Sequence, residues 1–344
     1  MKKLLALLLA SIMVISLAAC GQKDTPQNDS QGTNGEEENK PITLTLSDLN
    51  AETGHTGIFC KHFKETIEAA GVNITIDYYP NGTLTGQDIE AVAAGLCDIM
   101  QCTPSTAAGI WAPMAAMDAP YIYTDVDEAM AVVRPGSAWM EYANENMRAS
   151  NVMMVGMFYA GTRETTTTSK PIYSLDDMKG LKLRVVNGDL YIKLFRAFGC
   201  EPTPMAFSEV PTALVTGVCE GQENPYSAIV TSNLYEIQDY VIETHHMPAN
   251  YGFYMNAASW DKLSSAQQEA LLDAMYETGC WNSAWIAEDL DKNRQICVDN
   301  GMTIITEADG LDLASFEQAA MGIYDDYADE WGDAVSIIKS CYEG

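Results

Sequence analysis

The chain has 344 residues, of which 19 are Lys or Arg and 48 are Asp or Glu, so its formal charge is −29. A polyanion of this size is repelled by phosphate backbones and by anionic lipid head groups, which excludes nucleic acid as an expected partner. Hydrophobic residues make up 47% of the chain and charged residues 19%. These proportions exclude a disordered chain, and the length fits two domains that each bury a core.

The first twenty residues have the pattern of an export signal. Two lysines precede an almost wholly apolar run from Leu4 to Leu17, which is shorter than the roughly 20 residues of a membrane-spanning helix. The run ends in Leu17-Ala18-Ala19-Cys20, which resembles the lipobox of bacterial lipoproteins. The resemblance implies that Cys20 is acylated after export and anchors the protein to the outer face of the cytoplasmic membrane. Plain secretion after cleavage is the alternative.

Residues 21–40 contain no aromatic and no aliphatic side chain and are rich in Gln, Asn, Asp and Glu. Such a segment cannot bury apolar surface, so it is predicted to be a flexible acidic tether between the signal and a folded body. Eight cysteines follow Cys20, and none forms a CxxC pair. They lie in apolar helix and strand patterns, which favours mostly free thiols that pack as small hydrophobic groups.

After the tether, strand and helix patterns alternate. Residues 42–49 and 72–79 alternate apolar and polar positions as strands do, and residues 56–70 between them have helical apolar spacing. The repeat of this pattern predicts a mostly parallel sheet with helices on both faces. The other predicted elements are strands at 97–102, 152–159, 181–186 and 254–258, and helices at 89–96, 125–133, 174–180, 189–198, 208–218 and 266–300.

The last of these helices is unusually long. Ser264 and Gln267 have the spacing of a capping box at its start, and only Gly279 interrupts its apolar pattern. At 1.5 Å per residue such a helix is roughly 50 Å long. It is therefore predicted to reach across more than one domain.

The sequence signatures of common enzymes are absent: the chain has no GxSxG, GxxxxGK[ST], GxGxxG or HExxH. His245 and His246 are adjacent in a predicted extended stretch, so they are expected to point to opposite faces and not to hold a metal jointly. Asp and Glu are so abundant that a pair of carboxylates is more often a solvated surface than an acid/base dyad. We therefore expect no metal, no cofactor and no catalysis.

Two of the six arginines stand apart from the others, which lie on or beside predicted helices as surface charges. Arg163 follows the predicted strand 152–159, and Arg184 lies inside the apolar strand 181–186. A buried guanidinium must find an anion, and its fork geometry matches a carboxylate. The pattern alone leaves two interpretations open, a structural salt bridge, which is the commoner outcome, and a site for a ligand carboxylate.

The segment from Gly217 to Pro225 is predicted to be the end of a helix followed by a polar turn. Asn224 precedes a proline, which favours an extended or turn conformation, and its amide can both donate and accept hydrogen bonds. A turn-stabilising role is the commoner one for such an asparagine, and a ligand contact is the alternative.

Several segments form a recognisable set in order and spacing. They are Asn81-Gly82-Thr83-Leu84-Thr85-Gly86, Gly161-Thr162-Arg163, Gly180-Leu181-Lys182-Leu183-Arg184-Val185, Pro202 to Val210, Gly221-Gln222-Glu223-Asn224-Pro225, and Trp260 to Ser264. Together they resemble the solute-binding proteins of tripartite ATP-independent periplasmic (TRAP) transporters of the DctP type. The resemblance extends from about Ile42 to the C-terminal region.

The resemblance implies a two-domain α/β fold of the periplasmic-binding-protein type. Each domain is expected to contain a mixed, mostly parallel sheet flanked by helices, with a long helix spanning both domains and a hinged ligand cleft between them. The expected domains are residues 41–161 with 250–289, and residues 162–249 with 290–344.

The resemblance also implies a ligand site and a function. Arg184 is expected to clamp the ligand carboxylate, Arg163 and Asn224 to add contacts, Phe207 to line the cleft and His55 to border it. The implied function is capture of an organic acid outside the cytoplasm and its delivery to the small and large subunits of a TRAP permease. The alternatives are the receptor of an ATP-driven importer and a surface-anchored hydrolase, which lacks a nucleophile motif.

Overall fold

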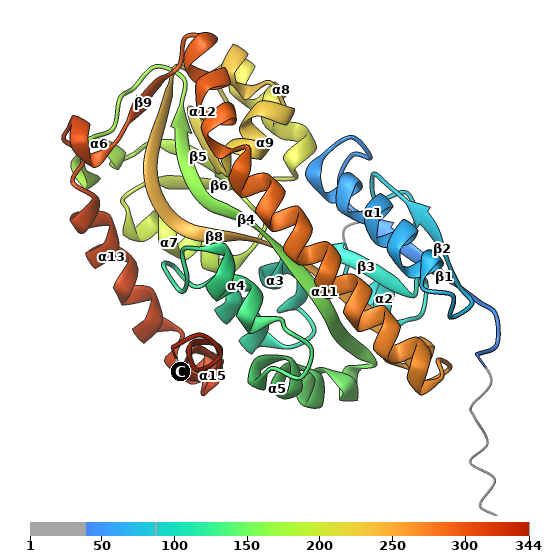
Figure 1. The fold of residues 1–344 in the computed structure, drawn as a ribbon. Helices are drawn as coiled ribbons and strands as arrows, with labels where there is room; N and C mark the ends of the chain where they lie inside the picture. The colour runs from blue at the N-terminus through green and yellow to red at the C-terminus, as the bar shows by residue number, and fades with distance from the viewer. Residues whose placement is uncertain (1–38, 87, 344) are drawn as a thin grey trace, which may run out of the picture. The chain divides into compact units, whose positions relative to one another are not determined.

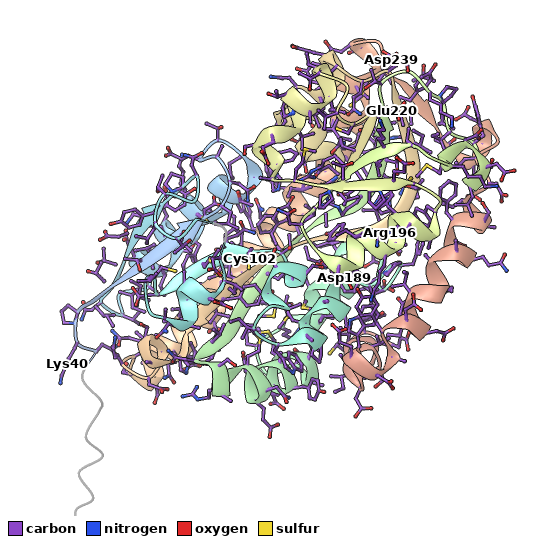
Figure 2. The ribbon with its side chains drawn as sticks, turned by 180° about the vertical axis from the view of Figure 1, so that it is seen from behind. Lys40, Cys102, Asp189, Arg196, Glu220 and Asp239 are labelled. Atoms are coloured by element: carbon purple, nitrogen blue, oxygen red, sulfur yellow. The ribbon has the colours of Figure 1, made fainter. Side chains whose placement is uncertain are left out.

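The structure, a computed structural model, describes residues 39–86 and 88–343. The predicted signal peptide, including Cys20, and nearly all of the predicted tether lie outside the described residues. The described chain begins beside Lys40 (Figure 2), whose carbonyl accepts a hydrogen bond from Gln267 Nε2 at 2.9 Å. Across the described ranges, none of the helices combines the length and the apolar character needed to cross a membrane.

The fold is α/β and is organised around one mixed sheet. The strand order is β2-β1-β3-β8-β4-β7-β5-β6, and β9 pairs with β8. The strands are β1 (Ile42–Asp48), β2 (Ile74–Tyr79), β3 (Ile99–Cys102), β4 (Val152–Thr167), β5 (Lys182–Val185), β6 (Glu201–Pro204), β7 (Gly221–Asn224), β8 (Tyr240–Asn256) and β9 (Thr303–Ile305). All pairs are parallel except β3·β8, β4·β7 and β4·β8. The predicted α/β class and mostly parallel sheet are confirmed.

Two long antiparallel strands, β4 and β8, run through the centre of the sheet (Figure 1). The predicted strands 152–159 and 254–258 were too short, because β4 continues to Thr167 and β8 begins at Tyr240, and Ala257 already belongs to a helix. The missed parts are rich in polar residues, several of which are nevertheless buried. A polar strand whose side chains find partners inside the protein does not show the apolar alternation by which strands are recognised.

Helices cover the sheet. They are α1 (His55–Ala69), α2 (Glu90–Ala93), α3 (Pro104–Ala107), α4 (Val126–Val132), α5 (Ala138–Met147), α6 (Leu175–Met178), α7 (Asp189–Ala197), α8 (Val210–Val215), α9 (Tyr226–Thr231), α10 (Ala257–Trp260), α11 (Ser265–Glu288), α12 (Leu290–Asp299), α13 (Leu313–Asp326), α14 (Ala328–Trp331) and α15 (Ala334–Ser340). The capping box of Ser264 and Gln267 starts α11 as predicted. The elements that were not predicted are β6, α3, α5, α9, α10, and the strand and helices after residue 300.

The predicted helix 266–300 is two helices that follow one another, α11 and α12. The break lies at Asp289 and not at Gly279, which is inside α11. A Cβ on Gly279 would lie 2.5 Å from the Met157 carbonyl oxygen, and one on Gly156 would lie 2.3 Å from Met275 Cγ. These two glycines let α11 pack closely along β4 (Figure 1).

The eight cysteines in the described part of the chain are free thiols, and six of them are buried. Several belong to the apolar clusters that hold the helices on the sheet. One cluster packs α1 and α11 on the strands of one end of the sheet, and its members include Leu46, Phe59, Cys60, Phe253 and Leu271. The cysteines thus pack as hydrophobic side chains, as expected.

Candidate functional site

Arg184 lies in β5 and is 2% exposed. Its Nε and Nη2 donate hydrogen bonds to the carbonyl oxygen of Met205 at 3.2 and 2.8 Å. Its Nη1 is buried and has no hydrogen-bond partner. The guanidinium carbon lies 5.6 Å from the ring centre of Phe207, close enough for a cation-π contact. One edge of a buried guanidinium is therefore left without an acceptor.

No carboxylate in the described part of the chain forms an ion pair with Arg184. Burial lowers the pKa of Arg184 to about 10, with Glu223 opposing and Arg163 reinforcing that effect. Arg184 still carries its charge at neutral pH. A buried charge without a counterion is unfavourable, so this group is stabilised when an anion reaches its free edge.

Arg163 has the opposite environment. It lies inside β4, not after a strand as predicted, and it is 3% exposed. Its Nε and Nη2 donate to the two carboxylate oxygens of Glu223 at 2.5 and 3.0 Å. Burial opposes both charges, but their attraction outweighs it, raising the pKa of Arg163 and lowering the pKa of Glu223 to about 2. The structural salt bridge that the sequence left open is thus present at Arg163 and absent at Arg184.

Asn224 lies beside this pair. The segment predicted to be a polar turn is the buried strand β7, which pairs with β4 and β5. The Asn224 Oδ1 accepts a hydrogen bond from Arg163 Nη2 at 3.1 Å, and its Nδ2 donates to Gln222. The side chains of this strand are polar, and those of Gln222, Glu223 and Asn224 all have partners inside the protein. Because a run of polar residues lacks the apolar pattern by which a buried strand is recognised, the segment was predicted to be a turn.

His55 is the first residue of α1 and is 8% exposed. Neither of its ring nitrogens has a hydrogen-bond partner. Its ring makes edge contacts with Phe158 and Tyr251, at centroid distances of 5.8 and 4.6 Å. Burial, with a smaller effect of the Arg163 charge, lowers the pKa of His55 to about 4. The imidazole is therefore neutral at physiological pH and has one donor and one acceptor free.

The structure brings four of the five predicted residues into two pairs, and the fifth, His55, lies near one of them. Arg184 contacts Phe207, and Arg163 contacts Asn224. Between Arg163 and His55 lies Tyr251, whose ring contacts His55 and whose pKa responds to the Arg163 charge. No direct contact joins His55 to Arg184 among the interactions of the described residues.

Sequence reasoning missed three residues of this region. Tyr191 on α7 lies under Arg163, with 5.5 Å between the guanidinium carbon and the ring centre. Tyr251 on β8 contacts His55. Asp118 is fully buried and accepts hydrogen bonds from Ser105 Oγ at 2.6 Å and from Asn250 Nδ2 at 3.1 Å. Two of them are aromatic residues on ordinary apolar faces, and nothing in the sequence distinguishes them from core tyrosines.

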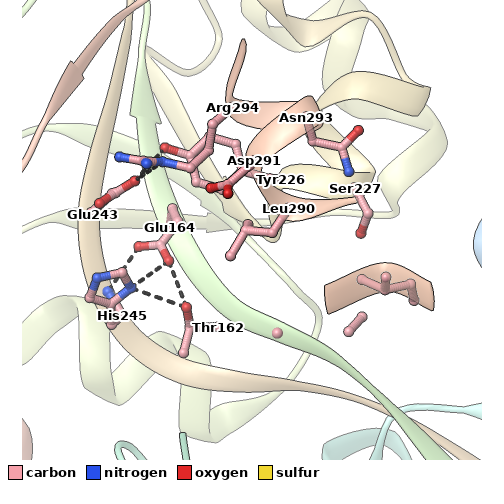
Figure 3. Close-up of a pocket in the computed structure, with 13 residues that line it drawn as sticks. Thr162, Glu164, Tyr226, Ser227, Glu243, His245, Leu290, Asp291, Asn293 and Arg294 are labelled. Carbon is pink, nitrogen blue, oxygen red and sulfur yellow. Dashed lines mark hydrogen bonds and ion pairs between the residues drawn. The ribbon is translucent and has the colours of Figure 1, made fainter. Parts of the chain in front are cut away.

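A pocket of a different kind lies beside this region (Figure 3), and none of the five predicted ligand residues lines it. Its wall includes Thr162 and Glu164, the neighbours of Arg163 in β4, which a strand directs to the other face. Arg294, predicted to be a surface charge, donates from Nε to Glu243 at 2.8 Å in this pocket.

In the same pocket, Glu164 accepts hydrogen bonds from the His245 N–H at 2.9 Å and from His245 Nδ1 at 2.7 Å (Figure 3). His245 has a φ of 46°, in the left-handed region. The register of β4 and β8 is irregular here, between Tyr159 and Thr162 and between Arg163 and Thr165. The Glu164–His245 pair therefore bridges the two central strands where their regular pairing is interrupted.

Comparison with known protein families shows to which family the chain belongs. Residues 46–330 match the family described as bacterial extracellular solute-binding protein, family 7, or DctP. The chain belongs to this family. Its members are extracytoplasmic proteins, and the resemblance stated from the sequence is confirmed.

Named relatives of the DctP family agree with this result. The solute-binding protein RD1_1052 of Roseobacter denitrificans is 32% identical over 282 residues, which are 81% of this chain and 85% of the relative. Its TRAP solute-binding structure with bound L-galactonate has a TM-score of 0.74 and covers 87% of this chain and 98% of that one, at 28% identity. A structure from Chromohalobacter salexigens with bound D-glucuronate has a TM-score of 0.77 and covers 87% and 99%, at 25% identity.

The Glu164–His245 pair of this DctP-family protein predicts a pH-dependent contribution to stability. Burial alone would raise the pKa of Glu164 and lower that of His245, but their contact reverses both shifts. Because the pKa of Glu164 is lowered on folding, its ionised form stabilises the folded protein at pH values above the usual Glu pKa near 4.3. This stabilisation is lost as the pH falls through the pKa of Glu164 in the folded protein. Because the pKa of His245 is raised on folding, its protonated form stabilises the folded protein at pH values below the usual His pKa near 6.5. This stabilisation is lost as the pH rises through the pKa of His245 in the folded protein.

We therefore expect His245→Gln to lower the free energy of unfolding more at about pH 5.5 than at about pH 8.5, measured by urea denaturation. His62→Gln, on α1 and stacked on Trp281, is the matched control. The effect of the His245 variant is compared with that of the His62 variant at each pH. An equal effect of His245→Gln at both would contradict the assignment of a charged pair.

Proposed function

We propose that this DctP-family protein captures an organic acid by pairing its carboxylate with Arg184, and delivers it unaltered to a TRAP permease of small and large subunits. The observation that carries the proposal is the buried Nη1 of Arg184, which has no partner in the described chain. The RD1_1052 and Chromohalobacter structures, which contain galactonate and glucuronate, support it, because both ligands carry a carboxylate.

The proposed binding step follows from the geometry of the site. Two nitrogens of Arg184 already donate to Met205, so the free Nη1 edge offers the hydrogen bonds that orient the carboxylate. Asn224 contacts Arg163, whose charge acts on that of Arg184, and the Phe207 ring covers Arg184. His55 supplies one donor and one acceptor for the rest of the ligand. In such a dry site these charge-assisted hydrogen bonds are strong.

We propose that the two lobes are residues 41–161 with 250–289, and residues 162–249 with 290–344, and that the ligand holds them closed. The irregular β4 register between Tyr159 and Thr162 and the helix break at Asp289 fall at these boundaries, which supports the division. Binding and release then require motion at these two points and at residues 249–250 of β8, where the chain also crosses between the lobes.

The proposal includes no chemical change of the ligand. The test is a thermal-shift screen of purified protein against monocarboxylates and dicarboxylates, with the screened acids recovered and analysed afterwards. We expect one or a few acids to raise the melting temperature in a concentration-dependent way and to be recovered intact. A screen in which no acid raises the melting temperature, or in which the stabilising acid is consumed, would contradict the proposed function.

We also propose that acylated Cys20 anchors the protein to the outer face of the cytoplasmic membrane. The support is the Leu17-Ala18-Ala19-Cys20 sequence, which lies outside the described residues. Cys20→Ala should move the protein from the membrane fraction to the soluble fraction, measured by fractionation and detergent extraction. Cys280→Ala, which alters a half-buried thiol of α11, is the matched control and should stay with the membrane. Retention of the Cys20 variant in the membrane fraction would disprove the anchor.

A further inference from the structure

The pocket of Figure 3 lies at two of the points where the chain passes between the proposed lobes. In β4, Ala160 belongs to one proposed lobe and Thr162 to the other. In the long helical segment, Ile286 precedes the break at Asp289 and Leu290 follows it. Because the lobes move against one another at these points, the shape of this pocket changes when the main cleft opens or closes.

The pocket combines room, an apolar wall and an unsatisfied hydroxyl. Its volume is about 200 Å³, whereas a single water needs only about 15 Å³, so a small organic molecule fits. Ile286 and Leu290 provide apolar surface, and Leu290 is 45% exposed. Ser227 on α9 is 8% exposed, and its Oγ has no hydrogen-bond partner in the described chain. A ligand that donates a hydrogen bond to this hydroxyl removes the cost of leaving it unpaired.

The cations that line the pocket are already matched by the protein. Arg294 Nε donates to Glu243 Oε1 at 2.8 Å, and His245 Nδ1 is paired with Glu164 Oε1 at 2.7 Å. Tyr226 also donates to Glu243 Oε1, at 2.8 Å. Both bonds to Glu243 use the same oxygen, so its Oε2 accepts no hydrogen bond from the described residues and is open to a donor.

Asp291, the second residue of α12, is the carboxylate of this pocket that lacks a counterion. Its side chain is exposed and forms no ion pair or hydrogen bond with the described part of the chain. The charged residues of the wall are two cations and three carboxylates, so one negative charge is uncompensated when His245 is protonated, and two when it is neutral. This excess disfavours an anion and favours a cation.

We propose that this pocket is a second binding site, for a small organic ammonium ion. An ammonium group has three donors and no acceptor, which matches acceptors that have no donor in the described chain: Glu243 Oε2, Ser227 Oγ and the Asp291 carboxylate. A short hydrocarbon body covers the apolar surface of Ile286 and Leu290.

Occupation of this site is coupled to the main cleft, a step that rests on the proposed function. The pocket is present while the proposed lobes are in contact, since Tyr121 Oη of one lobe donates to the Thr244 carbonyl oxygen of the other at 2.8 Å. An ammonium ion that fits this arrangement binds it better than an arrangement with the lobes apart. It therefore favours closure and, by linkage, strengthens binding of the acid.

The first test is binding of n-butylammonium to the purified protein without any acid, measured by titration calorimetry. The controls are n-butanol and butyrate, which have the same chain length but no positive charge. The ionic strength is held constant with NaCl, because a protein with a charge of −29 attracts any cation weakly. We expect butylammonium to bind at least about ten-fold more tightly than either control. Equal or weaker binding of butylammonium would overturn the proposed site.

Variants locate the bound ion. Asp291→Asn removes the unmatched charge and should weaken butylammonium binding by about five-fold or more. Ser227→Ala removes the free hydroxyl and should act in the same direction. Asp299→Asn removes an equal charge from an exposed position of the same helix and should leave the affinity within about two-fold of the wild type. Unchanged affinity of the Asp291 variant, or equal losses in the Asp291 and Asp299 variants, would overturn the assignment to this pocket.

The second test measures the coupling with an acid found in the thermal-shift screen. Saturating butylammonium should tighten binding of the acid by about five-fold or more, and saturating acid should tighten binding of butylammonium by the same factor. Unchanged or weaker binding would overturn the coupling. If no acid binds, the proposed function fails and the coupling fails with it, whereas the ammonium site is decided by the first titration alone.

Discussion

Replacing Arg184 with Met is expected to abolish ligand binding while leaving the ligand-free protein as stable as the wild type or more so. The loss of affinity should be at least about 100-fold, because the ligand carboxylate would be buried without its counterion. The stability of the free protein should not fall, because the substitution removes a buried charge that no carboxylate of the described chain pairs with. The two measurements are calorimetric affinity and thermal melting without ligand.

The matched control is Arg196→Met, on the exposed face of α7 (Figure 2). It removes one positive charge from the same region of the chain, so it controls for long-range attraction of an anion to the protein. We expect its affinity to remain within about two-fold of the wild type at physiological salt. If Arg184→Met bound the acid normally, or if both variants lost binding equally, Arg184 would not be the carboxylate site.

Replacing Arg163 with Met is expected to have the largest effect on stability. The substitution leaves Glu223 fully buried, with His246 Nε2, 3.5 Å from its carboxylate, as the remaining side-chain contact in the described chain. Breaking a buried ion pair by removing one member costs about 3–5 kcal/mol. We expect a decrease of this size in the free energy of unfolding at neutral pH, measured by urea denaturation.

This decrease should depend on pH in a defined direction. The lowered pKa of Glu223, about 2, means that its ion pair contributes stability above the usual Glu pKa near 4.3 and loses it as the pH falls toward the folded-state value. The difference between wild type and Arg163→Met should therefore shrink from about pH 5 to about pH 3. A constant difference over this range would contradict the ion pair as its source.

A double variant separates charge from packing. Arg163→Met combined with Glu223→Gln removes both charges and keeps the volumes similar, so it should recover much of the lost stability. Recovery is expected because a neutral amide in β7 costs less to bury than an unpaired carboxylate. If the double variant were less stable than Arg163→Met alone, packing and not charge would account for the destabilisation.

Local patterns in the sequence were sufficient for much of the fold. The Ser264–Gln267 capping box, the first β-α-β unit and the apolar strand around Arg184 all form near the predicted residues. Each depends on interactions between residues close in the chain, or on a repeating apolar face that any core would bury. The family, and with it the α/β class, followed from short segments whose order and spacing are visible without coordinates.

The tertiary structure decided which arginine is free. In sequence, Arg163 and Arg184 are equivalent: each lies in or near a strand, and each requires an anion. Glu223 is 60 residues from Arg163 and 39 from Arg184, and only the pairing of β7 with β4 brings it to the first and not the second. The buried polar strand β7 itself was hidden for the same reason. Polar residues are stable in the interior only through partners distant in the chain, and the identity of those partners is a property of the folded molecule.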